Sequence, residues 1–470
     1  MKVEQIYTGC IAHAAYYLES NGEAAIFDPL REVQPYIDRA AKDNAHIKYV
    51  FETHFHADFV SGHLNLQAKA GATIVFGPNA QPAYQALIAT DGQVFTIGNC
   101  KVTAIHTPGH TMESTTYLLT DEDGHDHGII TGDTLFIGDV GRPDLAQHVI
   151  ADLTEEKLAR TLYHSLHNKI LPLSNHLLVY PNHGAGSACG KKMSLETTDT
   201  LGNQKKVNYA LQPMTEDEFV KAILSGLTPP PGYFPKNVLM NIKGYESIDT
   251  IMQRGYKPLN PQAFEFAANE TRALILDTRP AELFARGFIP NSINIGLDGS
   301  FAPIAGELIT DIKQPILIVA ENGKEEESII RLSRVGYDNS IGYLQGGMDA
   351  WIKAGKETDT VHRIAARQLE EMYENENFLL VDVRKKSEYD AEHIIGAVNM
   401  PLHQLNLHLA SLPKQNLFVI HCAGGYRSMV AASLLKQRGF NNFADVTGGY
   451  KAIAATTIPK SHYVCPTTLL

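Results

Sequence analysis

A histidine-rich segment, residues 53–63, directly follows an apolar run at residues 49–51 that is typical of a buried strand. Three more polar residues follow apolar runs in the same way: His110 after 102–105, Asp133 after 129–130, and His183 after 179–180. Strand ends bring side chains from distant parts of a chain to one edge of a scaffold. Histidine nitrogens and carboxylate oxygens are metal ligands. The sequence therefore predicts an α/β scaffold whose strand ends converge on a metal site.

The spacing within the segment is specific. His54, His56 and Asp58 stand two positions apart, and Phe59 follows. With the downstream histidine, aspartate and histidine, this series resembles the metallo-β-lactamase superfamily, whose motif is His-x-His-x-Asp-His. The resemblance implies an αββα sandwich and a metal-dependent enzyme. Phe59 departs from the motif, because a phenyl ring offers no lone pair where a histidine helps to hold a second metal. One metal per chain is therefore expected.

Within the superfamily the chain resembles persulfide dioxygenases most. That resemblance implies one Fe(II) per chain held by His54, His110 and Asp133, with O2 as co-substrate and zinc as an alternative metal in the isolated protein. Two histidines and one carboxylate leave open positions for oxygen and substrate. His56, Asp58 and His183 would then orient ligands, water or substrate. The alternative is a binuclear zinc thioester hydrolase of the glyoxalase II type, which needs the histidine that Phe59 replaces.

The composition excludes several classes of protein. A chain of 470 residues is expected to form roughly three domains. Lys and Arg number 40 against 52 Asp and Glu, and this net charge of −12 argues against nucleic-acid partners. We find neither a signal peptide nor an apolar run that could span a membrane. Five widely spaced cysteines indicate free thiols in the cytoplasm, with the roles of Cys10, Cys189 and Cys465 left open.

The second half of the chain contains an internal duplication. Asp277 and Asn294 recur as Asp382 and Asn399, each 105 positions later, within similar apolar surroundings. A glycine pair at residues 346–347 recurs 102 positions later. Each copy alternates strand and helix patterns, which predicts a parallel sheet flanked by helices.

In the second copy, an apolar strand at residues 417–420 leads into Cys422, Ala423, Gly424, Gly425, Tyr426, Arg427 and Ser428. A thiol in a glycine-rich loop before a helix lies among backbone N–H groups, which lower its pKa and bind anions. Arg427 adds a charge and paired donors for sulfur oxyanions. This Cys-x-x-Gly-x-Arg loop resembles rhodaneses. The related cysteine phosphatases need one more residue between cysteine and arginine, and a non-reactive buried cysteine is the remaining alternative.

The first copy departs from this pattern. Alignment on its strand, residues 315–319, places Glu321 where Cys422 stands, and the following loop is two residues shorter and carries four glutamates. Glutamates repel an anionic sulfur donor, so we predict a non-catalytic rhodanese-like domain that serves as a spacer or docking wall. A different activity that uses the glutamates is the alternative.

The sequence thus predicts three α/β domains. Residues 1–245 would form a persulfide dioxygenase-like domain, 255–358 an inactive rhodanese-like domain and 360–470 an active rhodanese. The predicted enzyme oxidises small persulfides to sulfite and thiosulfate in sulfide detoxification, and Cys422 carries sulfane sulfur. A non-enzymatic sulfur-relay scaffold is disfavoured, because both predicted sites contain a complete set of the residues that their chemistry needs. The sequence leaves open the thiol carrier and the oligomeric state, a homo-oligomer included.

Overall fold

The computed structural model of the chain describes residues 1–145, 153–227, 229–375 and 378–464, so Cys465 lies outside the described residues. Two compact units divide the chain. The first comprises Met1–Thr250 with Leu332–Tyr337, and the second comprises Ile251–Arg331 with Asp338–Leu470. The three domain ranges expected from the sequence stay a prediction. Within the described residues, every helix is too short or too polar to cross a bilayer.

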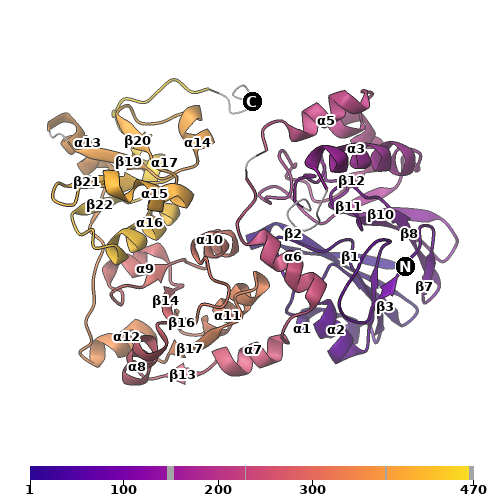
Figure 1. Ribbon diagram of the computed structural model, residues 1–470, viewed down its shortest axis with the longest axis horizontal. Helices are drawn as coiled ribbons and strands as arrows, with labels where there is room; N and C mark the ends of the chain where they lie inside the picture. Colours follow the sequence, from indigo (N-terminus) through magenta and orange to yellow (C-terminus); the bar gives the residue numbers. More distant parts are fainter. Residues whose placement is uncertain (146–152, 228, 376–377, 465–470) are drawn as a thin grey trace. The chain divides into compact units, whose positions relative to one another are not determined.

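The first unit contains two six-stranded sheets (Figure 1). The first sheet has the order β1 (Lys2–Thr8), β2 (His13–Ser20), β3 (Glu23–Phe27), β4 (His46–Phe51), β5 (Thr73–Phe76) and β6 (Leu87–Ile88). The second has the order β12 (Asp199–Thr200), β11 (Leu178–Pro181), β10 (Asp126–Gly132), β9 (Thr115–Thr120), β8 (Cys100–His106) and β7 (Val94–Ile97). Strands β3 to β6 run parallel, whereas β7 to β10 are antiparallel.

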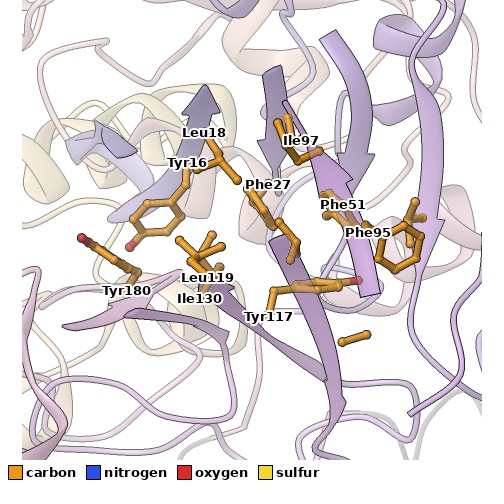
Figure 2. Close-up of a cluster of buried hydrophobic side chains, with 14 of the residues drawn as sticks. Tyr16, Leu18, Phe27, Phe51, Phe95, Ile97, Tyr117, Leu119, Ile130 and Tyr180 are labelled. Carbon is orange, nitrogen blue, oxygen red and sulfur yellow. The ribbon is translucent and has the colours of Figure 1, made fainter. Parts of the chain in front are cut away.

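The two sheets pack face to face around a buried aromatic core. Figure 2 shows Phe27 and Phe51 from the first sheet facing Tyr117 and Ile130 from the second. Strand β2 is buried on both faces, because Tyr16 points into this core while Tyr17 packs in the cluster on the other face of the first sheet. Continuous burial of this kind is what a strand between a second sheet and covering helices requires.

Helices cover the outer face of each sheet. Those on the first sheet are α1 (Gln34–Lys42), α2 (His63–Ala70) and α6 (Phe234–Lys243), and those on the second are α3 (Glu155–Ser165), α4 (Leu201–Val207) and α5 (Glu216–Leu224). In Figure 1, α1 and α2 lie below the sheets of this unit and α3 and α5 lie above them. The order of layers is therefore αββα, which confirms the predicted sandwich.

The second unit contains two five-stranded sheets with all strand pairs parallel. One has the order β13 (Pro258–Leu259), β17 (Ser340–Leu344), β16 (Ile316–Val319), β14 (Leu274–Asp277) and β15 (Ile293–Asn294). The other has the order β18 (Arg363–Ile364), β22 (Phe443–Val446), β21 (Phe418–His421), β19 (Leu379–Asp382) and β20 (Ala397–Asn399). The two orders are the same, so the predicted duplication and its parallel sheets are confirmed.

The helices of this unit also correspond between the copies. The first copy has α8 (Pro261–Thr271), α9 (Ala281–Arg286), α10 (Phe301–Leu308), α11 (Glu325–Arg334) and α12 (Gly347–Lys353), preceded by α7 (Ile248–Gly255). The second has α13 (Ala366–Asn375), α14 (Lys386–Ala391), α15 (Leu405–His408), α16 (Tyr426–Gln437) and α17 (Gly449–Ile453). Each copy has its own apolar core, with Trp351 in the first and Leu380 in the second.

Strand register corrects the alignment of the two copies. Asp277 pairs with Val319, and its equivalent Asp382 pairs with His421. Ala320, not Glu321, therefore occupies the position of Cys422. The sequence comparison was wrong because it matched the ends of the apolar runs, whereas the second strand continues through the buried polar residue His421.

Two glycines support the corrected register. A Cβ on Gly347 would lie 3.3 Å from the carbonyl oxygen of Ala320, and one on Gly449 would lie 2.4 Å from that of Cys422. Counted from the corrected position, Gly336 follows after 16 residues in the first copy, and the equivalent Gly439 after 17 in the second. The first copy's loop is therefore one residue shorter, not two.

Candidate functional site

Two histidines and one aspartate from different strand ends meet in the first unit. His54 follows β4, His110 follows β8 and Asp133 follows β10. One ligand atom of each lies within 4.8 Å of the other two. The Asp133 Oδ2 atom lies 3.4 Å from His110 Nε2 and 3.9 Å from His54 Nε2. We call these residues the first triad, and the structure brings them together as the strand-end argument required.

The ring orientations turn the Nε2 atoms of both histidines toward Asp133. His54 Nδ1 lies 2.9 Å from Thr53 Oγ1, and His110 Nδ1 lies 2.8 Å from the carbonyl oxygen of Arg142. Donation of Nδ1–H to that carbonyl gives His110 a lone pair on Nε2, the tautomer that metal binding needs. Burial and the neighbouring His56 and His110 hold the pKa of His54 well below its usual value. A neutral His54 is therefore ready to act as a ligand.

A close backbone contact and one asparagine side chain hold the loop that carries His54. Gly132 has a φ of 54°, and a Cβ there would lie 2.5 Å from Thr53 Oγ1. Only glycine fits so close to the loop that carries His54. The Asn241 amide on α6 donates to the carbonyl oxygens of His56 at 2.8 Å and Phe59 at 2.9 Å. A helix distant in sequence thus fixes the turn after His54.

His56 is hydrogen-bonded away from the first triad through one of its nitrogens. Its Nε2 lies 2.9 Å from Asp28 Oδ1 and 3.3 Å from Glu52 Oε2, while Nδ1 has no hydrogen-bond partner among the described residues. Burial opposes a charge on this ring, but Asp28 and Glu52 outweigh it and raise the pKa of His56 well above its usual value. Phe59 stacks on the same ring, with centroids 4.3 Å apart.

A second cluster of buried polar side chains also contacts Asp133. Asp58, His183 and Cys189 are buried and place one ligand atom each within 4.8 Å of the others, and we call them the second triad. His183 Nε2 lies 3.5 Å from Asp58 Oδ2 and 3.5 Å from Asp133 Oδ1. The two carboxylate oxygens of Asp133 therefore face different triads. Burial, followed by the carboxylates of Asp58 and Asp133, raises the pKa of Cys189 well above its usual value.

Several buried polar atoms at the two triads lack a hydrogen-bond partner among the described residues: Asp58 Oδ1, Asp133 Oδ1, Asp133 Oδ2 and His183 Nε2. Unpaired buried carboxylate oxygens are costly, at about 1–3 kcal/mol or more for each charged group. A metal ion satisfies such atoms, so the residues present fit a metal centre.

The cysteine loop, residues 422–428, forms the other candidate site. Cys422 is buried, and its Sγ accepts a hydrogen bond from Gly425 N–H at 3.2 Å. The carbonyl oxygens of Cys422 and Ala423 accept hydrogen bonds from Tyr450 and Lys451 at the start of α17. Gly425, with a φ of 103°, is the N-cap of α16. The loop thus turns a backbone donor toward the thiol, at the positive end of a helix.

The remaining loop residues have defined partners. Arg427 makes two hydrogen bonds to Glu388 on α14, and Ser428 Oγ donates to the carbonyl of Gly425. The phenol of Tyr426 donates to the carbonyl of Gly296 in the first copy at 2.6 Å. A Cβ on Gly424 would meet no other described atom within 4 Å.

Two protein-family models match different parts of the chain. The model of the metallo-beta-lactamase superfamily matches residues 8–183, and the model of the rhodanese-like domain matches residues 261–354 and 365–456. The human persulfide dioxygenase ETHE1, mitochondrial, is 30% identical over 201 residues, which cover 42% of this chain and 70% of that protein. The chain belongs to the metallo-β-lactamase superfamily. It also carries two rhodanese-like domains.

Other members of the superfamily show a similar degree of identity. A probable hydroxyacylglutathione hydrolase of Schizosaccharomyces pombe is 28% identical over 183 residues, which cover 38% of this chain and 66% of that protein. The crystal structure of a metallo-beta-lactamase from Staphylococcus aureus subsp. aureus COL aligns with a TM-score of 0.64 and 29% identity, over 73% of this chain and 98% of that one. The last alignment extends beyond the metallo-β-lactamase domain.

Sequence reasoning missed Asp28, Glu52, Glu388 and the position of Cys189. Asp28 and Glu52 follow the apolar ends of β3 and β4, so the rule that found His110 and Asp133 could have found them. Glu388 and Cys189 have no such signal. Their roles depend on the paths of loops and on a helix 39 positions away from Arg427.

Proposed function

We propose that this chain is a non-haem iron persulfide dioxygenase joined to a sulfurtransferase. The reaction at the first triad would convert RSSH, O2 and H2O into RSH, sulfite and two protons. The observation that carries this proposal is the composition of the first triad: two imidazole nitrogens and one carboxylate oxygen. Such a set is typical of mononuclear non-haem iron oxygenases, because it occupies one face of the metal and leaves the other open.

Iron(II) held by His54, His110 and Asp133 would supply the redox chemistry that O2 needs and would bind the persulfide sulfur. The chain's own residues would hold the metal and orient its ligands. The carbonyl of Arg142 fixes the ring of His110, and Thr53 does the same for His54. Burial of all three members keeps bulk water from the reacting groups, and a site that holds substrate beside O2 gains from proximity.

Cys422 would perform the second reaction. Its thiolate attacks the outer sulfur of a donor such as thiosulfate, the donor's S–S bond breaks, and sulfite leaves with the bonding electrons. The resulting Cys422 persulfide then passes that sulfur to an acceptor thiolate or to sulfite, which restores the thiolate. The N–H of Gly425, the start of α16 and Arg427 would stabilise the anionic groups. Ala320 offers no nucleophile, which supports an inactive first copy.

Thioester hydrolysis at a binuclear zinc centre is the second candidate. Hydroxyacylglutathione hydrolases are similar to this chain at identities close to that of the persulfide dioxygenase. Asp133 also faces both triads, as a carboxylate shared by two metals would. Phe59 argues against this candidate, because its ring packs on His13 and His56 where the hydrolase motif has a metal-binding histidine.

Anaerobic purification, metal analysis and two activity assays separate the candidates. The full-length protein loaded with Fe(II) should consume O2 when glutathione persulfide is added, and sulfite should form in equal amount when Cys422 is replaced by serine. Hydrolysis of a glutathione thioester without any O2 uptake would overturn the proposal and favour the zinc hydrolase.

A further inference from the structure

We infer that the first rhodanese-like copy binds a small zwitterion of the α-amino acid type in a cavity at its own strand ends. The cavity has a volume of about 180 Å³, and we call it the first-copy cavity. Its lining includes five charged side chains, those of Asp298, Glu321, Lys324, Glu327 and Arg331. The inference goes beyond the two proposed reactions and does not depend on either of them.

The topology of the sheet predicts a crevice at this place. Strands β14 and β16 are neighbours, but the chain leaves β14 toward β15 on one side and leaves β16 toward β17 on the other. In parallel sheets, ligands bind outside the carboxyl ends of two such strands, where the connections diverge. Thr278 directly follows β14, and Glu321 and Lys324 follow β16. The first-copy cavity therefore lies where this rule expects a ligand.

The second copy has its cysteine loop at the same place. Its strands have the same order, and Cys422 follows β21, the equivalent of β16. Matching hydrogen bonds support the equivalence of the cavity walls. Leu297 N–H donates to the carbonyl of Thr278 at 3.1 Å. In the same way, Leu402 N–H donates to the carbonyl of Val383 at 3.1 Å. The first copy thus lacks the thiol but has a hollow at the position of a catalytic loop.

Lys324 and Arg331 supply positive charge to the cavity. Both pair with one carboxylate, because Lys324 Nζ lies 2.9 Å from Glu327 Oε2 and Arg331 donates to the other oxygen. The hydrogen bond from Lys324 and the charge of Arg331 outweigh burial and lower the pKa of Glu327. Arg331 also donates to the carbonyl of Leu297 at 2.7 Å, which holds its guanidinium at the cavity wall. Two cations share one carboxylate, so one positive charge is left for an anionic group of a ligand.

Asp298 and Glu321 supply negative charge. Neither carboxylate pairs with the two cations of the cavity, which both bind Glu327. Both residues are exposed, so each can bind a ligand without first breaking a salt bridge within the cavity. Exposed carboxylates alone are ordinary surface residues. These two line a cavity that also holds cations, and an ammonium group is the partner that they can take.

The charges and the volume together select the class of ligand. A phosphate or thiosulfate ion would meet three carboxylates, and a simple cation would meet Lys324 and Arg331. A zwitterion satisfies both sets, because its carboxylate can pair with the cations and its ammonium group with Asp298 or Glu321. The cavity of about 180 Å³ is slightly larger than one of about 150 Å³ that holds benzene, so a ligand of about six to ten heavy atoms fits. Small α-amino acids such as serine and cysteine have this size and charge pattern.

The wall of the cavity also contacts the cysteine loop of the second copy. The phenol of Tyr426 donates to the carbonyl of Gly296, and a Cβ on Gly299 would lie 2.4 Å from the tyrosine ring. Asp298 stands between these glycines, and its charge adds to the effect of burial in raising the pKa of Tyr426. The segment 296–299 therefore lines the cavity and also holds the loop that carries Cys422.

Isothermal titration calorimetry of the full-length protein with L-serine tests the inference. Serine has the shape of cysteine but no thiol that could react at iron or at Cys422. We expect one L-serine to bind per chain with a Kd below about 1 mM. Two analogues, 3-hydroxypropionate without the ammonium group and ethanolamine without the carboxylate, should bind at least about tenfold more weakly. Equally tight binding of either analogue would contradict recognition of a zwitterion and overturn the inference.

Three variants locate the binding site. Asp298→Asn and, separately, Lys324→Gln should each weaken L-serine binding at least about tenfold. Glu326→Gln, at an exposed position on α11 outside the cavity lining, should bind L-serine as the parent does. Equal melting temperatures of all three variants and the parent exclude misfolding as the cause of weaker binding. No heat of binding in the parent, or binding that survives in both Asp298→Asn and Lys324→Gln, would overturn the inference.

Discussion

The guanidinium of Arg427 and the carboxylate of Glu388 form a two-point ion pair, with N–O distances of 2.6 and 2.8 Å. Burial opposes ionisation of Glu388, but the hydrogen bonds and charge of Arg427 outweigh it and hold the pKa of Glu388 below its usual value. The pair thus stays charged, and Glu388 neutralises the cation of the cysteine loop. A dianionic donor that approaches Arg427 therefore also meets a negative charge.

Replacement of Glu388 by glutamine should improve thiosulfate as a donor. The amide oxygen can still accept from Arg427, but the negative charge is gone, and one screened charge near the surface is worth about 1 kcal/mol. We expect kcat/KM for thiosulfate to rise roughly three- to tenfold, with a smaller change for an uncharged organic persulfide. Glu371→Gln, at an exposed position in the same copy, is the control. A fall in kcat/KM for thiosulfate would mean that Glu388 mainly positions Arg427.

Replacement of Asp133 by asparagine should remove iron and oxygen consumption together. The variant lacks the charge that both triads share, and we expect iron content and O2 uptake to drop about 100-fold. Thiosulfate sulfurtransferase activity should stay at the parent level, because Cys422 lies in another domain. His125→Ala, whose side chain is 78% exposed, should retain both activities. Full iron retention in Asp133→Asn would contradict the assignment of the first triad.

Replacement of Cys422 by serine should reduce thiosulfate sulfurtransferase activity more than about 100-fold. The first copy has Ala320 at the equivalent position and cannot substitute. Cys100→Ser tests the effect of losing a different buried thiol and should keep full activity. Substantial sulfur transfer by Cys422→Ser would show that another cysteine or the first copy is active.

The sequence predicted the elements that depend on local pattern. The ends of β4, β8 and β10 carry His54, His110 and Asp133 because an apolar run followed by a polar residue is a local signal. The duplication was predictable for the same reason, since its landmarks recur at nearly constant spacing.

Other features depend on packing that no local pattern encodes. The equivalence of Ala320 and Cys422 needed the strand register, because His421 is polar yet buried inside β21. Cys189 reaches Asp58 and His183 through a loop without regular structure. The partner of Arg427 lies on a helix whose placement follows from the tertiary fold. Each case relates residues that are distant in sequence, so the relationship can be seen only in the folded chain.

Asp445 in β22 should make the second rhodanese copy less stable as pH rises through about 6. Burial outweighs the hydrogen bond and the positive charge of Arg363, which also pairs with Glu282, and raises the Asp445 pKa to about 6. Because the folded-state pKa is the higher one, the stabilisation is complete below about pH 4 and is lost as pH rises through 6.

Asp445→Asn removes this titration. The difference in urea midpoint between parent and variant, followed by circular dichroism, should favour the parent more at pH 5 than at pH 8. Asp390→Asn, at a partly exposed residue that pairs with the exposed Lys386 in the same copy, should show a difference that hardly changes with pH. A constant difference for Asp445→Asn across this range would contradict the raised pKa.

The last prediction concerns the two proposed reactions in one chain. Sulfite formed at the first triad can attack the outer sulfur of the Cys422 persulfide. The S–S bond of the persulfide breaks, thiosulfate leaves, and the Cys422 thiolate is restored. Covalent linkage of two sites raises the effective concentration of an intermediate to about the millimolar range when geometry allows transfer. The parent given persulfide and O2 should therefore release mainly thiosulfate, whereas Cys422→Ser should release mainly sulfite.

A mixture of Asp133→Asn and Cys422→Ser chains provides the matched control, because it contains both activities on separate molecules. If linkage matters, dilution should lower the thiosulfate fraction of the mixture but leave that of the parent unchanged, since transfer within one chain is independent of concentration. Products are measured by thiol-reactive labelling after early quenching, because sulfite and persulfide also react without an enzyme. Equal sulfite-to-thiosulfate ratios in the parent and in Cys422→Ser would mean that the domains act independently.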